Sequence, residues 1–122
     1  MKRILFIFIL LAVNNIVMAQ DKKITRIAKI TIDSLQTAAY SQLLKEQMDA
    51  AVKTEPGVLS YTVYADKIHP YNITIIEVYA DSNAYLSHRE TAHFKKYKLA
   101  VKDMVKSLEL TEVIPLLSSK KE

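Results

Sequence analysis

The strongest constraint on the fold is a break at Glu55-Pro56-Gly57, which holds the only glycine of the chain. Proline lacks the N–H that a helix interior needs, and glycine tolerates a left-handed turn. A helix that precedes this tripeptide is therefore expected to end there. Residues 37–53 fit such a helix, because apolar side chains recur at three- and four-residue spacing: Tyr40, Leu43, Leu44, Met48, Ala51 and Val52.

Segments on both sides of this helix have the composition of strands. Residues 24–32 alternate between apolar and polar side chains, broken only by Arg26, and later segments are rich in β-branched and aromatic residues. The predicted strands are residues 24–32, 58–65, 71–80 and 108–114. Asp81-Ser82 and Thr91 are predicted to cap two further helices, over residues 83–89 and 92–105.

The resulting order, β-α-β-β-α-α-β, predicts an α+β protein of the ferredoxin-like kind, with a four-stranded antiparallel sheet. Its helices would cover one face of the sheet. The third strand carries Ile75 and Ile76 in succession, so apolar residues point to both faces. Stacking against the sheet of a second copy would cover the other face, which predicts a homodimer. The alternative is a monomer with a half-exposed sheet.

The first 19 residues have the layout of a secretory signal peptide. Lys2 and Arg3 precede an apolar run, and Val17-Met18-Ala19 supplies a cleavage site near Ala19. A retained span is the alternative, but it needs about twenty apolar residues, and Asn14-Asn15 interrupt the run. We expect a periplasmic or secreted protein with no membrane association after cleavage. The domain would occupy residues 20–115, followed by a flexible tail at 116–122.

Charge and cysteine content exclude several classes of protein. The chain has 17 basic and 13 acidic side chains, and loss of Lys2 and Arg3 leaves 15 against 13, a net charge of +2. That balance gives no support to nucleic-acid binding. With no cysteine, the domain has no disulfide framework and must be stabilised by packing or by a partner subunit.

With these segments placed, the chain resembles the antibiotic biosynthesis monooxygenase superfamily of small dimeric α+β barrels. The residues that carry the resemblance are Glu55-Pro56-Gly57, Leu59, Tyr61, Pro70, Glu77, Tyr79, Ala84, His88 and His93-Phe94. Members of this superfamily include cofactor-independent oxygenases of phenols and quinols, an enzyme acting on a phosphorylated signalling sugar, and haem-degrading enzymes. The chain has no tryptophan, and Tyr79 stands where the family often carries one, which disfavours the haem branch.

The resemblance implies an enzyme that oxidises a small aromatic quinol or phenol with dioxygen and without a cofactor. Such an enzyme needs an apolar slot, a base to ionise the phenol and a hydrogen bond to the anion. The candidate catalytic residues are His88, His93 and Glu77, because imidazole is a usable base near neutral pH and Glu77 could orient it or take the proton. The candidate pocket residues are Tyr61, Tyr64, Tyr79 and Phe94.

Each candidate also has a structural interpretation. Glu77 could cap a helix or pair with Arg89, His88 could face the last carbonyls of its helix, and the tyrosines could belong to the core or the dimer interface. His69 is expected to be a solvated loop residue.

The five-residue spacing of His88 and His93 across a helix break matches no common zinc or iron motif, so no metal site is predicted. Two further functions remain open: a non-catalytic module that binds a small ligand, and a non-oxidative isomerase or lyase.

Overall fold

The computed structural model describes residues 22–122, and the expected signal peptide at 1–19 lies outside them. The elements are β1 (Ile24–Ile32), a short 3-10 helix η1 (Ser34–Gln36), α1 (Thr37–Thr54), β2 (Val58–Ala65), β3 (Asn72–Tyr79), α2 (Ser82–Arg89), α3 (Ala92–Ala100) and β4 (Val105–Val113). The predicted ferredoxin-like α+β order is therefore confirmed. No helix among residues 22–122 combines the length and apolar character needed to cross a bilayer.

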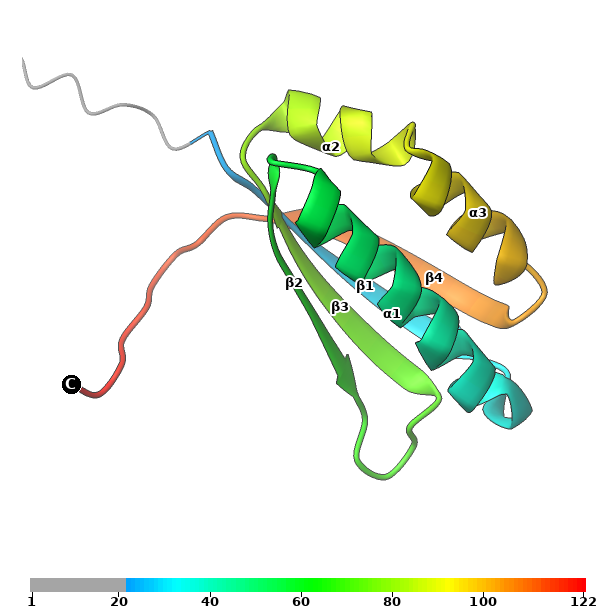
Figure 1. Cartoon of the computed structure of the whole chain (residues 1–122). Helices are drawn as coiled ribbons and strands as arrows, with labels where there is room; N and C mark the ends of the chain where they lie inside the picture. The colour runs from blue at the N-terminus through cyan, green and yellow to red at the C-terminus, as the bar shows by residue number, and fades with distance from the viewer. Residues whose placement is uncertain (1–21) are drawn as a thin grey trace, which may run out of the picture.

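All strand pairs are antiparallel, and the strand order in the sheet is β2-β3-β1-β4. The three helices lie on one face of this sheet, with α2 and α3 following one another above it (Figure 1). The chain after β4 runs away from the body of the molecule (Figure 1). We refer to the sheet face under the helices as the floor, and to α1, α2 and α3 together as the helical cover.

The core forms between this cover and one face of the sheet, because alternate residues of β1 and β3 point toward the helices. Tyr40 of α1 and Tyr97 of α3 are buried in the same cluster, and their hydroxyl oxygens lie 2.6 Å apart. This hydrogen bond ties α1 to α3. The buried residues of the cluster are Ala28, Ile30, Ile32, Tyr40, Leu44, Ile73, Ile75, Tyr97 and Val101.

The predicted helix caps are confirmed. The Asp81 carboxylate accepts a hydrogen bond from the Ala84 N–H at 2.8 Å, and the Thr91 hydroxyl accepts one from the Phe94 N–H at 3.3 Å. Each cap satisfies an N–H group that has no partner inside its own helix. These caps fix where α2 and α3 begin, and so they fix the positions of the two histidines that the helices carry.

The last helix is shorter than its periodicity predicts. It ends at Ala100 instead of residue 105, and β4 begins at Val105 instead of residue 108. The cause is pairing with β1: Val105 lies opposite Ile32, and the Asp33 N–H donates to the Met104 carbonyl at 2.8 Å. Sheet formation therefore takes residues that could have continued the apolar stripe of the helix.

Gly57 has a different role from the one expected, because it does not have a positive φ. A Cβ atom at this position would collide with the Cβ of Ala84, the third residue of α2. The glycine is needed for the close approach of α2 to the turn before β2. The predicted left-handed turn is wrong, although the predicted helix stop is confirmed.

This contact predicts that Gly57→Ala destabilises the protein by about 1–3 kcal/mol, because the added methyl group meets a side chain that cannot rotate away. Urea unfolding followed by circular dichroism measures the free energy of unfolding. A double-mutant cycle with Ala84→Gly should show favourable coupling, since the smaller partner relieves the collision. Unchanged stability of the single variant would contradict this explanation.

Candidate functional site

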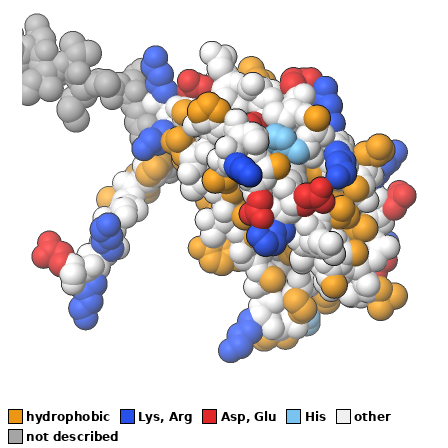
Figure 2. All heavy atoms as spheres, viewed as in Figure 1, with side chains coloured by type: hydrophobic (Ala, Val, Ile, Leu, Met, Phe, Trp, Pro, Cys, Tyr) orange, Lys and Arg blue, Asp and Glu red, His pale blue; other side chains and the backbone are white. Residues whose placement is uncertain are grey.

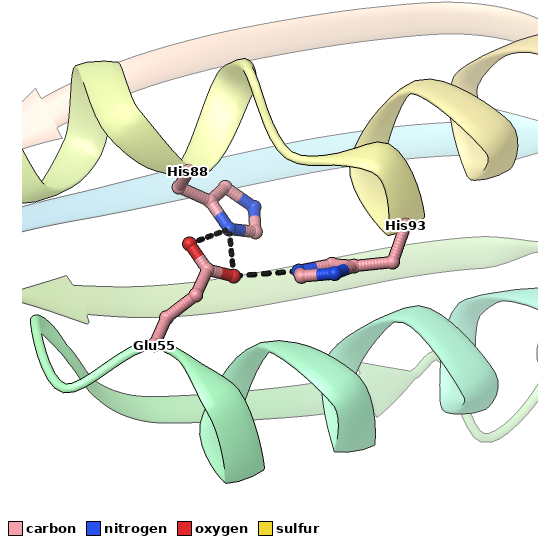
Figure 3. Close-up of side chains that lie close together, drawn as sticks. All are labelled: Glu55, His88 and His93. Carbon is pink, nitrogen blue, oxygen red and sulfur yellow. Dashed lines mark hydrogen bonds and ion pairs between the residues drawn. The ribbon is translucent and has the colours of Figure 1, made fainter.

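The two histidines named from the sequence meet at one carboxylate. Glu55, the residue at which α1 ends, accepts hydrogen bonds from His88 Nδ1 at 2.9 Å and from His93 Nε2 at 2.7 Å, both at its Oε2 atom. Figure 3 shows the three side chains converging from the ends of α1, α2 and α3. The single carboxylate of Glu55 therefore links α1 to both α2 and α3.

The burial of these three residues differs, and the difference separates their roles. The His88 side chain is 1% exposed, Glu55 14% and His93 23%. A histidine surface is visible on the helical face of the molecule (Figure 2). The carboxylate therefore connects a buried imidazole to one that reaches solvent.

The hydrogen bonds indicate the tautomer of His88. A carboxylate only accepts hydrogen bonds, so the Nδ1 atom that faces Glu55 carries the proton. The other ring nitrogen, Nε2, then holds a lone pair and lies 3.4 Å from the Nε2 amide nitrogen of Gln47. Gln47 is 2% exposed and also donates to the Tyr61 hydroxyl at 3.3 Å. His88 is thus held with its basic nitrogen turned away from Glu55.

Aromatic rings surround the His88 imidazole. Its centroid lies 4.9 Å from the ring of Phe94, 5.5 Å from that of Tyr79 and 6.3 Å from that of Tyr61. These four side chains all line one cavity of about 340 Å³ between the α2–α3 segment and the sheet. That volume is in the range of sites that bind small molecules.

Glu77 lies on the floor of this cavity, in a polar row that crosses the sheet. The strand register places Tyr61, Glu77, Arg26 and Glu112 side by side on β2, β3, β1 and β4. The Tyr79 hydroxyl donates to the Glu77 carboxylate at 2.6 Å, and Arg26 lies 3.8 Å from Glu112. The next row along the sheet, which contains Val63, Ile75, Ala28 and Leu110, is apolar. The floor is therefore polar at one end and apolar beyond it.

Three cavity tyrosines have raised pKa values. Burial is the largest cause for Tyr61, Tyr79 and Tyr97, and the negative charge of Glu77 raises the pKa further in each case. A hydrogen bond to Glu77 adds to the effect on Tyr61 and Tyr79, whereas the bond from Gln47 lowers the pKa of Tyr61. These phenols stay protonated near neutral pH, so they serve as hydrogen-bond donors and not as bases.

Not every predicted site residue lies in the cavity. Tyr64 is 57% exposed and pairs with Thr74. It is three residues from Tyr61 along β2, so its side chain points to the opposite face of the sheet, away from the helices. His93 lines a separate groove between α1 and α3, also of about 340 Å³. Glu77 does not orient a histidine: it accepts a hydrogen bond from Tyr79, and the His88 imidazole is oriented by Glu55 instead. His69 lies in the exposed 66–71 loop, as expected.

The sequence reasoning missed Glu55, Gln47 and Tyr97. Two local signals could have found the first two. A carboxylate at a helix C-terminus is disfavoured by the helix dipole, so Glu55 needs a compensating partner. Gln47 lies four residues from both Leu43 and Ala51, and thus interrupts the apolar stripe of α1 with a polar side chain.

The same cluster could also hold a cation. Glu55, His88 and His93 each offer one ligand atom, and these atoms lie within 4.8 Å of one another. Two imidazoles and a carboxylate are a donor set that zinc accepts. The sequence did not reveal this set, because the spacing of the two histidines alone matched no metal motif and the third member lies 33 residues before His88.

Comparisons with known proteins agree with the fold. The family model described as antibiotic biosynthesis monooxygenase matches residues 23–99. A solved structure from Bacteroides thetaiotaomicron, provisionally named as such an enzyme, is 42% identical, with a TM-score of 0.77 over 83% of this chain and 96% of that one. No curated protein matches the chain.

Two more distant structures show the same architecture. One from Lactobacillus acidophilus, provisionally named a monooxygenase, is 29% identical with a TM-score of 0.76, over 79% of this chain but only 46% of that one. One from Caulobacter crescentus is 18% identical, with a TM-score of 0.74 over 80% of this chain and 92% of that one. At that identity the likeness concerns the fold alone.

Proposed function

Because this chain belongs to the antibiotic biosynthesis monooxygenase family, we propose that it is an exported, cofactor-independent monooxygenase of a small aromatic phenol or quinol. The observation that carries the proposal is the buried His88 imidazole, whose Nδ1 is held by Glu55 at 2.9 Å while its ring lines a cavity of about 340 Å³. The charged start and apolar run before Ala19 support the export.

In the proposed reaction one oxygen atom enters the ring and the other leaves as water. A naphthol, for example, reacts with dioxygen to give a naphthoquinone and one water molecule, and the substrate supplies all the electrons. Electron transfer to dioxygen is easier from the phenolate than from the phenol, so the protein's main task is to remove the phenol proton. No bound cofactor is required for this balance.

His88 Nε2 is the proposed base, and the phenol takes the place of the Gln47 amide nitrogen, which lies 3.4 Å from it. When His88 takes the phenol proton, the ring becomes an imidazolium whose Nδ1–H still faces the Glu55 carboxylate, and the charge pair stabilises that state. His93, partly exposed, donates from Nε2 to the same carboxylate oxygen at 2.7 Å, and so holds Glu55 in place from the far side. His93 would therefore act without touching the substrate.

Tyr97 is the proposed donor to the phenolate oxygen. It lines the cavity, and its hydroxyl pairs with that of the fully buried Tyr40 at 2.6 Å. If Tyr40 donates in that pair, the Tyr97 proton is free to point at a ligand. Because the pKa of Tyr97 is raised by burial, the hydroxyl keeps this proton. Glu77 accepts the hydrogen bond of the Tyr79 hydroxyl and is the second proton acceptor in the cavity.

Oxygen uptake with a panel of naphthols, anthrones and menaquinol analogues tests this proposal. We expect turnover by the wild type, a loss of roughly 100-fold or more in His88→Gln, and a smaller loss in His93→Gln, because a positioned base contributes about 10²–10⁴-fold. His69→Gln, at an exposed loop histidine, is the matched control and should be unaffected.

Two outcomes would contradict the proposal. No uptake above background across the panel would leave a ligand-binding module or a non-oxidative enzyme. Activity that disappears after dialysis against a chelator, and returns with a divalent metal, would assign the Glu55–His88–His93 cluster to a metal instead of to proton transfer.

We also propose that two copies stack through the sheet face that the helices leave uncovered. On that face Ile27, Ile76 and Val78 are only half-buried, and Tyr64 is exposed. Burial of apolar surface of this kind is the main favourable term in protein association. The dimeric barrel implied by the family resemblance has the same arrangement.

Light scattering tests this assembly. At micromolar concentration the mature protein should give about twice the mass of one chain, and Ile76→Glu should reduce it to the mass of a monomer, since it places a charge in the interface. Val52→Glu, on the exposed surface of α1, carries the same charge change and should leave the dimer intact. A monomeric wild type would refute the stacked arrangement.

A further inference from the structure

The cavity beside His88 has an excess of positive charge. Three cationic side chains line it, Arg26, Arg89 and Lys98, against the single carboxylate of Glu77. Arg26 already has partners, because it lies 4.3 Å above the ring of Tyr85, pairs with Glu112 and is the cross-strand neighbour of Glu77. The other two cations are different.

Arg89 and Lys98 are exposed, and within residues 22–122 neither has a carboxylate within ion-pair distance. The guanidinium of Arg89 lies 5.8 Å from the ring of Tyr85. By contrast, two neighbouring lysines are paired: Lys95 lies 2.9 Å from Glu90, and Lys96 lies 2.9 Å from Glu46. Among the cations that line the cavity, Arg89 and Lys98 are thus the two without an ion pair in the described residues. The pKa of the Glu90 carboxyl is lowered mainly by Lys95, and Arg89 is close enough to lower it further.

Their position defines one side of the cavity mouth. Arg89 lies in the last turn of α2 and Lys98 in the last turn of α3. The β4 side of the same cavity presents Leu108 and Leu110, which are 43% and 52% exposed. A cation in a last turn also stabilises its helix, but that role does not require both residues to face the cavity. The mouth therefore has a cationic side and an apolar side.

The deep end of the cavity, unlike the mouth, does not favour a negatively charged group. Its floor combines apolar side chains with the neighbouring Glu77 and Arg26, whose opposite charges offset one another, so it offers an incoming anion little net attraction. The favoured orientation of an anionic ligand therefore has its ring on the apolar floor and its charge at the mouth. A phenol group at the other end of the ring would then lie near His88.

We infer that the ligand of this cavity is a hydroxylated aromatic acid, whose carboxylate or equivalent anion lies between Arg89 and Lys98. The inference rests on the proposed function for the position of the phenol group, and it adds the acidic group as the feature by which the substrate is recognised. A neutral phenol of the same size would bind through the floor alone.

A matched pair of ligands tests this inference by binding, without turnover. The fluorescence of 6-hydroxy-2-naphthoate and of 2-naphthol, which differ only in a carboxylate opposite the hydroxyl group, is titrated with the full mature protein under nitrogen. We expect the acid to bind about 5- to 10-fold more tightly at low salt, since each exposed ion pair contributes little. Added salt should reduce the difference between the ligands.

The variant Arg89→Gln/Lys98→Gln should bring the acid to the affinity of the naphthol and leave the naphthol unchanged. The control Lys102→Gln/Lys106→Gln removes the same net charge from exposed residues that do not line the cavity, and should keep the preference. All four substituted residues are exposed, so circular dichroism should show an intact fold for both double variants.

The possible failures are distinguishable. If the two ligands bind equally, or if the double variant keeps the preference for the acid, the inference is wrong while the proposed oxidation of phenols stands. If neither ligand binds, the proposed function falls with it, because the cavity then does not accept aromatic rings at all.

Discussion

The hydrogen bonds between Glu55 and two imidazoles are the interaction on which the site depends. A carboxylate at the end of α1 is unfavourable next to the negative end of the helix dipole, and it is also largely buried. His88 and His93 compensate for this from two other helices. The same contacts hold the three helices together and set the orientation of His88. Stability of the helical cover and placement of the proposed base therefore share one cause.

The other part of the site comes from the sheet, where the strand register decides which side chains lie next to one another. Because residues paired across strands share a face, the sequence positions of Tyr61, Glu77 and Arg26 become one polar row across the floor. The neighbouring rows are apolar and form the core. Where the helical cover meets the polar row, tyrosine hydroxyls, a carboxylate and the His88 ring border one cavity. Its amphiphilic lining favours a ligand with a ring and polar groups at its ends.

The sequence predicted the elements well, because their signals are local. Alternation defines β1, the Glu55-Pro56-Gly57 break ends α1, and side-chain caps at Asp81 and Thr91 begin α2 and α3. The end of α3 was wrong because the pairing of Val105 with Ile32 depends on β1, which lies far away in sequence. The role of Gly57 was wrong for a similar reason, since its requirement comes from Ala84.

The site was only partly predictable for the same physical reason. His88 and Glu77 could be named from residue type and spacing, but the partner of each could not. Glu55 reads as part of a turn until α2 and α3 are placed above it. Tyr64 was assigned to the pocket although it differs from Tyr61 in strand parity. Residue types therefore suggest the chemistry, whereas the three-dimensional packing decides which groups meet.

The most direct test of the account is the absorption spectrum of a bound nitrophenol under nitrogen, at a pH where the free compound is mostly neutral. Proton transfer to His88 predicts that the bound molecule shows the yellow absorption of its anion, and that His88→Gln loses this signal while His69→Gln keeps it. A nitrophenol that binds in the cavity yet retains the spectrum of the neutral phenol would contradict the account.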